Sequence, residues 1–331
     1  MKRFILVLSA LAILSAGATS QTLDGFQTAF QTFADDMAGV LAANSTVGNV
    51  WSQAYVGGFP RFGVGLALGA NFVPADSAEP LFAAAGETLP AELANVGIPI
   101  PAAALSFKIG LPFLNMDVGV KGGLIPDSAS GALSGMGVNA TYETLGVNLR
   151  YALLKDRLVI PAVSIGASWN YIKGSVATGL GAGPTNYAFN DGTYNYTVSV
   201  SDPDLELNWQ ANTFDFTIQA SKNLLIFTPY LGAGLTIGTT SVDGGMSAAT
   251  TVSDDNPATT TDQQIRDAIE AATGIVVTDQ GFLVSASSNA PTIRIYGGTS
   301  INILILKLDL MASYVPATQA LGAQAMVRIQ L

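Results

Sequence analysis

The sequence predicts an antiparallel transmembrane β-barrel of about 10 strands, with 8–12 as the range, preceded by an amphipathic helix. Three observations carry this prediction. Charged residues make up 11% and hydrophobic residues 49% of the chain, whereas ordinary soluble domains have about 25% charged residues. No run after the N-terminus approaches the roughly 20 consecutive apolar residues of a membrane-spanning helix. From position 60 onward, segments of about ten residues alternate apolar and polar side chains, as barrel strands do.

The first 18 residues have the features of a secretory signal peptide. Lys2 and Arg3 precede an apolar run over 4–14, and small residues follow at 16–18, which predicts cleavage near Thr19 or after Ser20. The chain contains no cysteine, so lipid-modified cysteine and disulfides are not available to it. We therefore expect an exported protein of the outer membrane of a Gram-negative-type bacterium.

Residues 19–50 are predicted to form an amphipathic helix and its C-terminal turn. Apolar residues recur at steps of three and four along it, and acidic residues take the other positions. We expect this segment to act either as a plug in the lumen or as a cap over the periplasmic mouth. The candidate plug residues are Phe26, Phe30, Phe33, Asp35 and Asp36.

The barrel is predicted to span residues 60–331. In the segment 61–72, Phe62, Val64 and Leu66 alternate with Gly63 and Gly65, so the even positions face lipid and the odd positions face the lumen. Nine further segments follow the same rule, at 105–111, 114–124, 145–154, 163–171, 205–220, 225–238, 292–303, 304–314 and 319–331.

The segment 205–220 changes parity in its middle. Leu205, Leu207 and Trp209 are odd, but Phe214 and Phe216 are even. This predicts a bulge near 212–213, or a break between two strands.

Short and long connections alternate along the predicted barrel. The links near 112–113, 155–157, 221–223 and 302 are short. The other links are mostly longer, at 74–103, 175–204 and 241–290, with shorter ones near 126–133 and 315–318. Outer-membrane barrels have short periplasmic turns and long external loops, which predicts that both termini lie in the periplasm. The segment 193–200 is either an extra strand or an external extension.

The predicted lumen is rich in basic residues. One interpretation is a channel that favours anions; the alternative is that these residues pair with one another and with the acidic face of the helix, at Asp24, Asp35 and Asp36. Inward glycines predict either an internal cavity or strand bending. The lumen-lining candidates are Arg61, Lys108, Asp117, Lys121, Arg150, Asp215, Arg294, Tyr296, Lys307, Asp309 and Arg328.

Composition excludes several kinds of chemistry. The chain has no histidine and no cysteine, so we expect no catalytic residues, no metal site and no cofactor, and the histidine-dependent barrel enzymes are excluded. Removing Lys2 and Arg3 from 14 basic residues leaves 12 against 24 acidic ones. This acidic balance argues against a nucleic-acid partner.

The last strand resembles the insertion signal of Gram-negative outer-membrane β-barrels, through Gly322, Val327, Ile329 and Leu331, although that signal usually ends in phenylalanine. The resemblance implies the barrel-assembly machinery, periplasmic chaperones, and outer-membrane lipid with its lipopolysaccharide-type surface as partners. The position of the N-terminal helix is similar to that of the plug in the fatty-acid transporter branch. That branch's Asn-Pro-Ala motif is absent from the leading segment.

Two long loops have distinct patterns. The segment 74–103 is apolar for a loop, which predicts a hydrophobic lid or packing into the barrel mouth. Thr261 and Gln264 have capping-box spacing before a short amphipathic helix, for which we expect packing at the rim.

Three functional hypotheses follow from the sequence. The first is passive uptake of a small hydrophobic or anionic solute through a plugged or gated lumen. The others are a surface-exposed adhesin or ligand-binding barrel, and a structural barrel without transport.

Overall fold

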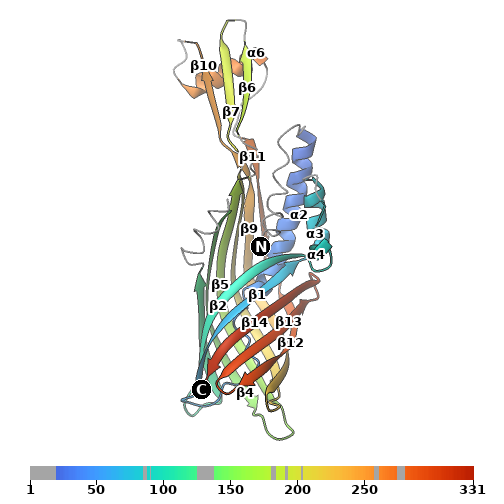
Figure 1. Ribbon diagram of the computed structural model, residues 1–331, viewed down its shortest axis with the longest axis vertical. Helices are drawn as coiled ribbons and strands as arrows, with labels where there is room; N and C mark the ends of the chain where they lie inside the picture. Colours follow the sequence, from blue (N-terminus) through green and yellow to red (C-terminus); the bar gives the residue numbers. More distant parts are fainter. Residues whose placement is uncertain are drawn as a thin grey trace.

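The computed structural model describes residues 20–84, 88–89, 91–124, 138–179, 184–190, 193–202, 204–256, 261–273 and 280–331 (Figure 1). The expected signal peptide, residues 1–18, lies outside the described residues. The chain forms a long barrel. In Figure 1 a helix lies beside the upper part of the barrel, and a small separate sheet lies above that same end.

Ten strands form a closed antiparallel ring, which confirms the predicted fold class and the strand number. Each strand pairs with the next in the ring, and the last pairs with the first. In ring order they are β1 Phe62–Val73, β2 Ile98–Gly110, β3 Met116–Leu124, β4 Val138–Leu154, β5 Ala162–Gly179, β8 Asp204–Ser221, β9 Phe227–Ala248, β12 Thr292–Ile303, β13 Leu306–Val315 and β14 Ala320–Gln330.

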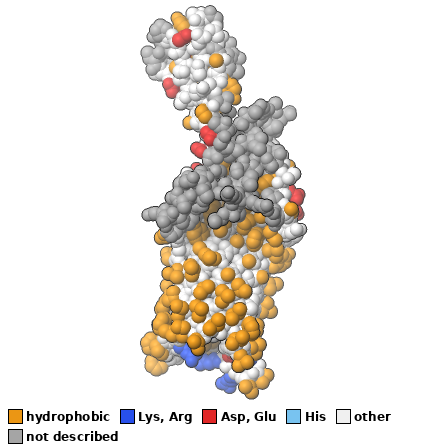
Figure 2. Space-filling model, viewed as in Figure 1, with side chains coloured by type: hydrophobic (Ala, Val, Ile, Leu, Met, Phe, Trp, Pro, Cys, Tyr) orange, Lys and Arg blue, Asp and Glu red, His pale blue; other side chains and the backbone are white. Residues whose placement is uncertain are grey.

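The two faces of the wall alternate with period two. Along β14, Leu321, Val327 and Ile329 are exposed, whereas Gln324 and Arg328 are buried. Exposed apolar side chains of this kind cover the lower part of the barrel as a continuous belt (Figure 2). A closed ring with an apolar outside satisfies its backbone hydrogen bonds internally and can therefore span a lipid bilayer.

Four short turns gather at one end of the ring, and the long connections lie at the other end, together with the short turn between β13 and β14. The short turns follow β2, β4, β8 and β12, and β1 begins and β14 ends beside them. At the other end lie α3 Ala75–Ala84 and α4 Ala91–Ala94. We call these the turn end and the loop end. In outer-membrane barrels the turn end is periplasmic.

A small head projects beyond the loop end (Figure 1). It consists of β6 Thr185–Asn190, β7 Asn195–Val200 and β10 Thr250–Asp254, with α6 Asp262–Thr273 packed on this sheet. The segment 193–200 therefore belongs to an external extension and not to the ring. The predicted capping box is present, since the Gln264 N–H donates to Thr261 Oγ1 at 3.3 Å. Rim packing was the wrong role for this helix, because Ile265 and Ile269 pack against Tyr196 and Val252 of the head.

The strand β11 Gln280–Ser288 pairs with the outer half of β9, and β8 pairs with β9 along its full length. These three strands extend the wall beyond the belt toward the head.

The bulge or break predicted in the segment 205–220 is wrong. The register of β8 is continuous with both β5 and β9, and its odd positions point inward throughout. Leu205 and Trp209 are buried against the helix α2 Ser20–Asn44, whereas Glu206 and Gln210 are exposed. The strand leaves the membrane near its middle, so the apolar side of β8 changes from outside to inside without a change of register.

The apolar face of α2 packs inside the loop end. Phe30, Phe33 and Leu41 are buried together with Leu81 and Phe82 of α3. The apolar residues of the segment 74–103 thus contribute packing at the barrel mouth. Within the described residues, no helix is long and apolar enough to cross a membrane.

After α2 the chain passes through the barrel interior. We call residues 45–56 the lumen segment. It begins beside Thr213 of β8, where the Ser45 and Thr213 hydroxyls are 2.8 Å apart, and it ends where the Val56 N–H donates to Asp117 near the turn end. Because α2 starts at the loop end (Figure 1), the expectation that both ends lie at the periplasmic side is wrong for the first described residues. A helical cap over the periplasmic mouth is wrong for the same reason.

Candidate functional site

The structure brings most of the predicted lumen residues into the barrel interior. Arg61 is the exception: its side chain is exposed at the turn end. The other ten are buried, namely Lys108, Asp117, Lys121, Arg150, Asp215, Arg294, Tyr296, Lys307, Asp309 and Arg328.

Three buried ion pairs neutralise half of the interior cations. Arg150 and Asp117 approach to 2.8 Å, and the pairs Arg294–Asp215 and Arg328–Asp309 approach to 2.7 Å. Each pair joins two strands of the wall. Removing one partner from such a pair would leave an uncompensated buried charge, which is strongly destabilising.

Two lysines bind the lumen segment through its backbone. Lys108 Nζ donates to the Asn49 carbonyl at 2.7 Å, and Lys121 Nζ donates to the carbonyls of Ser45 and Val47. Among the described residues, neither lysine forms an ion pair. Their charges are therefore satisfied by the lumen segment and not by carboxylates of the wall.

Glycines of the wall make room for these lysines. A side chain at Gly119 would clash with Lys108 Cγ, and one at Gly146 would clash with Lys121 Cε, each at 2.8 Å. The inward glycines at these positions thus accommodate long side chains from neighbouring strands. The interpretation that they leave an open cavity is wrong here.

Trp51 is the largest fully buried side chain of the lumen segment. Its ring lies 5.4 Å from Lys108 Nζ and 4.9 Å from the guanidinium carbon of Arg328, within the range of a cation–π interaction. Its indole N–H donates to Ser106 Oγ at 3.2 Å. The indole ring of Trp51 therefore fills the centre of the charged lumen and also donates a hydrogen bond to the wall.

Wall amides and ion-pair partners hold the rest of the segment. Gln219 Nε2 donates to the carbonyls of Trp51 and Ser52, and the Gly48 N–H donates to Gln324 Oε1 at 2.9 Å. Asp117 accepts from the Val56 N–H at 3.0 Å while it pairs with Arg150. The lumen segment and the wall thus satisfy many of each other's polar groups.

The expected pairing of the acidic helix face with the lumen cations is wrong for Asp35 and Asp36. Asp36 accepts a hydrogen bond from Ser77 of α3, and Asp35 is exposed and accepts from Gln31. Both aspartates lie in the loop half, above the polar part of the lumen. The lumen lysines instead face residues 45–49, which follow the helix. The side chains of Phe26 and Asp24 lie outside the described part of the structure.

Sequence reasoning missed Ser45, Asn49 and Trp51 as lumen residues, because the end of the helix was interpreted as a turn leading to the first strand. A usable signal was present. The segment 45–56 carries no charged residue, although it lies between an acidic helix and a wall with many cations.

Two buried side-chain amides in this region have polar atoms without a hydrogen-bond partner. Both polar atoms of Asn148 and the Oδ1 atom of Asn49 are buried without a hydrogen bond, and a side chain at Gly119 would lie 2.8 Å from Asn148 Nδ2. Unsatisfied amides of this kind can bind water or a polar group.

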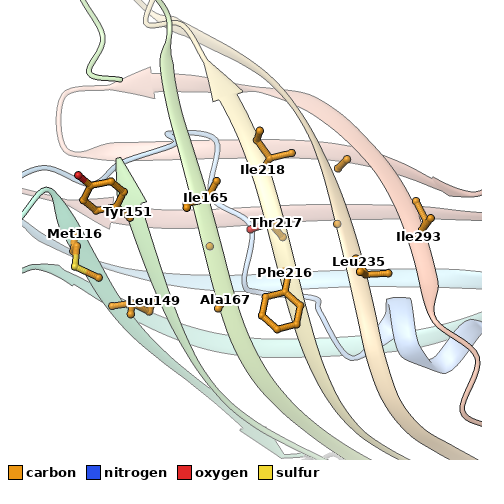
Figure 3. Close-up of a pocket in the computed structure, with 13 residues that line it drawn as sticks. Met116, Leu149, Tyr151, Ile165, Ala167, Phe216, Thr217, Ile218, Leu235 and Ile293 are labelled. Atoms are coloured by element: carbon orange, nitrogen blue, oxygen red, sulfur yellow. The ribbon is translucent and has the colours of Figure 1, made fainter. Parts of the chain in front are cut away.

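A groove of about 580 Å³ lies on the outer face of the barrel and not in the lumen. Figure 3 shows its lining, in which Leu149, Ile165, Phe216 and Ile218 are exposed and apolar. This groove belongs to the membrane-facing belt, where acyl chains cover the wall.

Comparison with known proteins gives only distant likenesses. No family model matches the sequence, and no curated protein sequence matches it. The structure is similar to the translocator domain of the autotransporter NalP from Neisseria meningitidis, with 11% identity over 94% of this chain and 99% of that chain and a TM-score of 0.28. It is also similar to the toluene transporter TbuX from Ralstonia pickettii, with 8% identity over 90% and 94% of the two chains and a TM-score of 0.27.

A third similar structure is LpxR from Salmonella typhimurium, with 8% identity over 80% of this chain and 99% of that chain and a TM-score of 0.25. At these values the likenesses carry no functional information. The chain's own structure identifies its class: a closed antiparallel ring, an apolar outer belt, short turns at one end and long loops at the other are the features of outer-membrane barrels. The protein is a ten-stranded β-barrel of the outer-membrane type.

Proposed function

We propose that the protein is a gated outer-membrane channel, without enzymatic activity, for a small and largely hydrophobic solute. The lumen segment and α2 form the gate. The observation that carries the proposal is that the wall closes through its own ten-stranded ladder, whereas the chain that occupies the interior precedes the wall in sequence. Displacing this chain would leave the ring intact. Eight strands are filled by their own side chains, so ten strands without the segment leave space for a solute.

The polarity of the interior supports a hydrophobic solute. The wall is apolar in the loop half, where α2 packs, and polar in the turn half. A hydrophobic solute that enters from the loop end would replace the contacts of α2 with the same surface. The apolar wall residues that it would meet include Ile100, Ile172, Leu205, Trp209, Val242 and Val284.

The polar half supports a preference for anionic groups in the open state. The three arginines remain neutralised by Asp117, Asp215 and Asp309 when the gate moves. Lys108 and Lys121 would instead lose their carbonyl partners and become available to the solute. Charged side chains that line a pore set its ion selectivity.

A disulfide between the gate and the wall tests the proposal. The variant S45C/T213C replaces two hydroxyls that are 2.8 Å apart, in a chain without other cysteines. We expect conductance in planar bilayers to be abolished under oxidising conditions and to return on reduction. The matched control is T141C/S175C, which joins two hydroxyls 2.7 Å apart within the wall and should leave conductance unchanged. If neither the full-length protein nor a variant that lacks residues 20–56 conducts, uptake would be contradicted.

The head supports a second candidate function, which is binding of an external ligand. Its core of Tyr196, Val198, Val252, Ile265 and Ile269 is separate from the barrel interior. A ligand-binding role predicts that removing the head abolishes attachment of cells to the ligand while conductance persists. Loss of conductance with intact attachment would count against this candidate.

A further inference from the structure

The short turns carry large apolar side chains at their tips. Leu225 is 100% exposed in the turn after β8, and Leu304 is 95% exposed in the turn after β12. Phe113 and Leu158 are similarly exposed in the turns after β2 and β4. In water, four exposed apolar tips on one rim would form an unfavourable surface.

The backbone at three of these tips favours glycine, not a large residue. Phe113, Leu225 and Leu304 have φ values of 61°, 51° and 54°, in the left-handed region that side chains with a Cβ rarely adopt. The turn after β8 is a two-residue hairpin turn, since Leu224 and Phe227 exchange backbone hydrogen bonds of 2.7 and 2.8 Å. Glycine is usual at a positive-φ position of such turns. Turn geometry alone therefore does not account for large apolar residues at these positions.

The membrane-facing belt reaches the level of these tips. Its upper boundary lies where the Trp169 indole donates to Asn212 at 2.8 Å, because aromatic girdles mark the interfaces of such barrels. From Asn212 to the end of β8 at Ser221 is about 30 Å along the strand, or about 21 Å at a tilt of about 45°. The apolar band of outer-membrane barrels is about 25 Å tall. The turn tips supply the remaining height.

Basic side chains surround the apolar tips. Figure 2 shows Lys and Arg gathered at the turn end, below the belt. Lys155 and Arg157 are exposed in the turn after β4, and Arg61 is exposed at the start of β1. Lys222 pairs with Asp156. Apolar residues beside cations are the combination found where proteins enter the interface of anionic membranes.

We propose that the turn rim, defined by Phe113, Leu158, Leu225 and Leu304, is inserted into the inner leaflet of the outer membrane. The tips lie among the acyl chains, and Lys155 and Arg157 bind the phosphates of anionic glycerophospholipids. On the face that Figure 2 shows, apolar side chains extend down the wall to the turn end, which favours lipid as the occupant. A periplasmic protein docked on the rim is the competing outcome of the test.

Spin labelling measures the depth of the tips directly. Full-length L225C and L304C proteins, labelled with a nitroxide in vesicles of phosphatidylcholine and phosphatidylglycerol, should collide several-fold more often with oxygen than with a water-soluble nickel complex. The control Y187C lies in the head, where the native side chain is 50% exposed, and should show the opposite ratio. Tips that are more accessible to nickel than to oxygen would overturn the proposal and favour a protein partner.

A glycine substitution tests the proposal through the direction in which the urea midpoint of unfolding changes. L304G relieves the strain of the left-handed backbone at this position, so it should raise the midpoint if the tip is in water. We expect the midpoint to fall in vesicles, because the acyl-chain contact of Leu304 is lost. A raised midpoint would contradict insertion.

Lipid selection tests the phosphate contacts. We expect the double variant K155Q/R157Q to reduce the ratio of phosphatidylglycerol to phosphatidylcholine that remains bound in native mass spectrometry by at least twofold. K173Q removes an exposed cation above the belt and should leave the ratio unchanged. An unchanged ratio in K155Q/R157Q would remove the phosphate contacts from the proposal. Because none of these three experiments requires an open lumen, all are independent of the proposed channel.

Discussion

The guanidinium carbon of Arg328 lies 4.9 Å from the ring centroid of Trp51, so the last strand of the wall contacts the chain that occupies the lumen. Arg328 also pairs with Asp309 and donates to Ser52 Oγ at 2.7 Å. One side chain thus links the wall, an ion pair and the lumen segment.

Replacing Trp51 by alanine should both destabilise the barrel and increase its leakage. A large-to-small substitution of a buried aromatic residue costs about 3–5 kcal/mol, and the space left would lie in the centre of the lumen. The urea midpoint of the refolded protein in vesicles measures the first effect, and bilayer conductance measures the second. W51F retains most of the volume and loses only the contact with Ser106, so it should cost about 1 kcal/mol. Equal effects of the two variants would contradict a packing role.

The pair Asp215–Arg294 should show strong coupling in a double-mutant cycle. D215N leaves a buried guanidinium that loses the carboxylate bound by both of its terminal nitrogens, and we expect a loss of about 3–5 kcal/mol. R294M on that background should recover most of this loss, because the uncompensated charge is removed. Additive losses in the double variant, measured by urea unfolding, would show that the pair is not coupled.

Selectivity of the opened channel should depend on the two lysines. In a protein that lacks residues 20–56, K108E/K121E should convert a preference for anions into one for cations, as measured by the reversal potential in a salt gradient. K173E is the control that reverses an exposed charge outside the lumen, and it should leave the reversal potential unchanged. If K108E/K121E leaves the reversal potential unchanged, these lysines do not line the conducting path.

The turn after β4 should have a pH-sensitive contact. Burial raises the pKa of the Asp156 carboxyl, but hydrogen bonds from Lys222 and from the Asn223 N–H outweigh it, so the pKa lies below its usual value. A lowered pKa stabilises the turn above the unfolded value of about 3.9 and stops doing so as the pH falls through the folded value. The Asn223 amide resonance should therefore titrate below about pH 3.9. In D156N it should not titrate, and titration there would assign the effect to another group.

The head should unfold without the barrel. Ile269 is fully buried in the head, so I269D should make residues 185–200 and 250–273 sensitive to protease while the ten wall strands stay protected. D267A changes an exposed position of the same helix and serves as the matched control. Cleavage within the wall of I269D would show that head and barrel fold as one unit.

Period-two patterning predicted the ten wall strands and their faces because each strand has a lipid side and a lumen side within the membrane. The same rule failed in β8, where Leu205 and Trp209 lie inside. There the outside is water and the inside is the helix α2, so an apolar side chain faces inward. The alternation of apolar and polar residues indicates which face of a strand meets the more apolar surroundings. Those surroundings differ between the part of β8 inside the membrane and the part above it.

The contents of the lumen were less predictable than its wall. Lys108 and Lys121 were correctly assigned to the inner face, but the sequence does not indicate that their partners are backbone carbonyls of Ser45, Val47 and Asn49. Every residue has a backbone carbonyl group, so a hydrogen bond to a carbonyl does not require a particular residue type and cannot be recognised from the sequence. The three ion pairs join residues between 19 and 79 positions apart, and only strand order and register bring them together.

The passage of the chain through its own barrel constrains the order of assembly. The ring closes where β1 pairs with β14, the first and last strands of the wall. Residues 45–56 are already enclosed by that ring, with α2 beyond its far opening. The N-terminal part is therefore enclosed while this seam forms, or its free end threads through the finished ring. The second route is the reverse of the displacement that would open the gate, so a ring that seals first can place Trp51 beside Arg328 only if the gate is able to move.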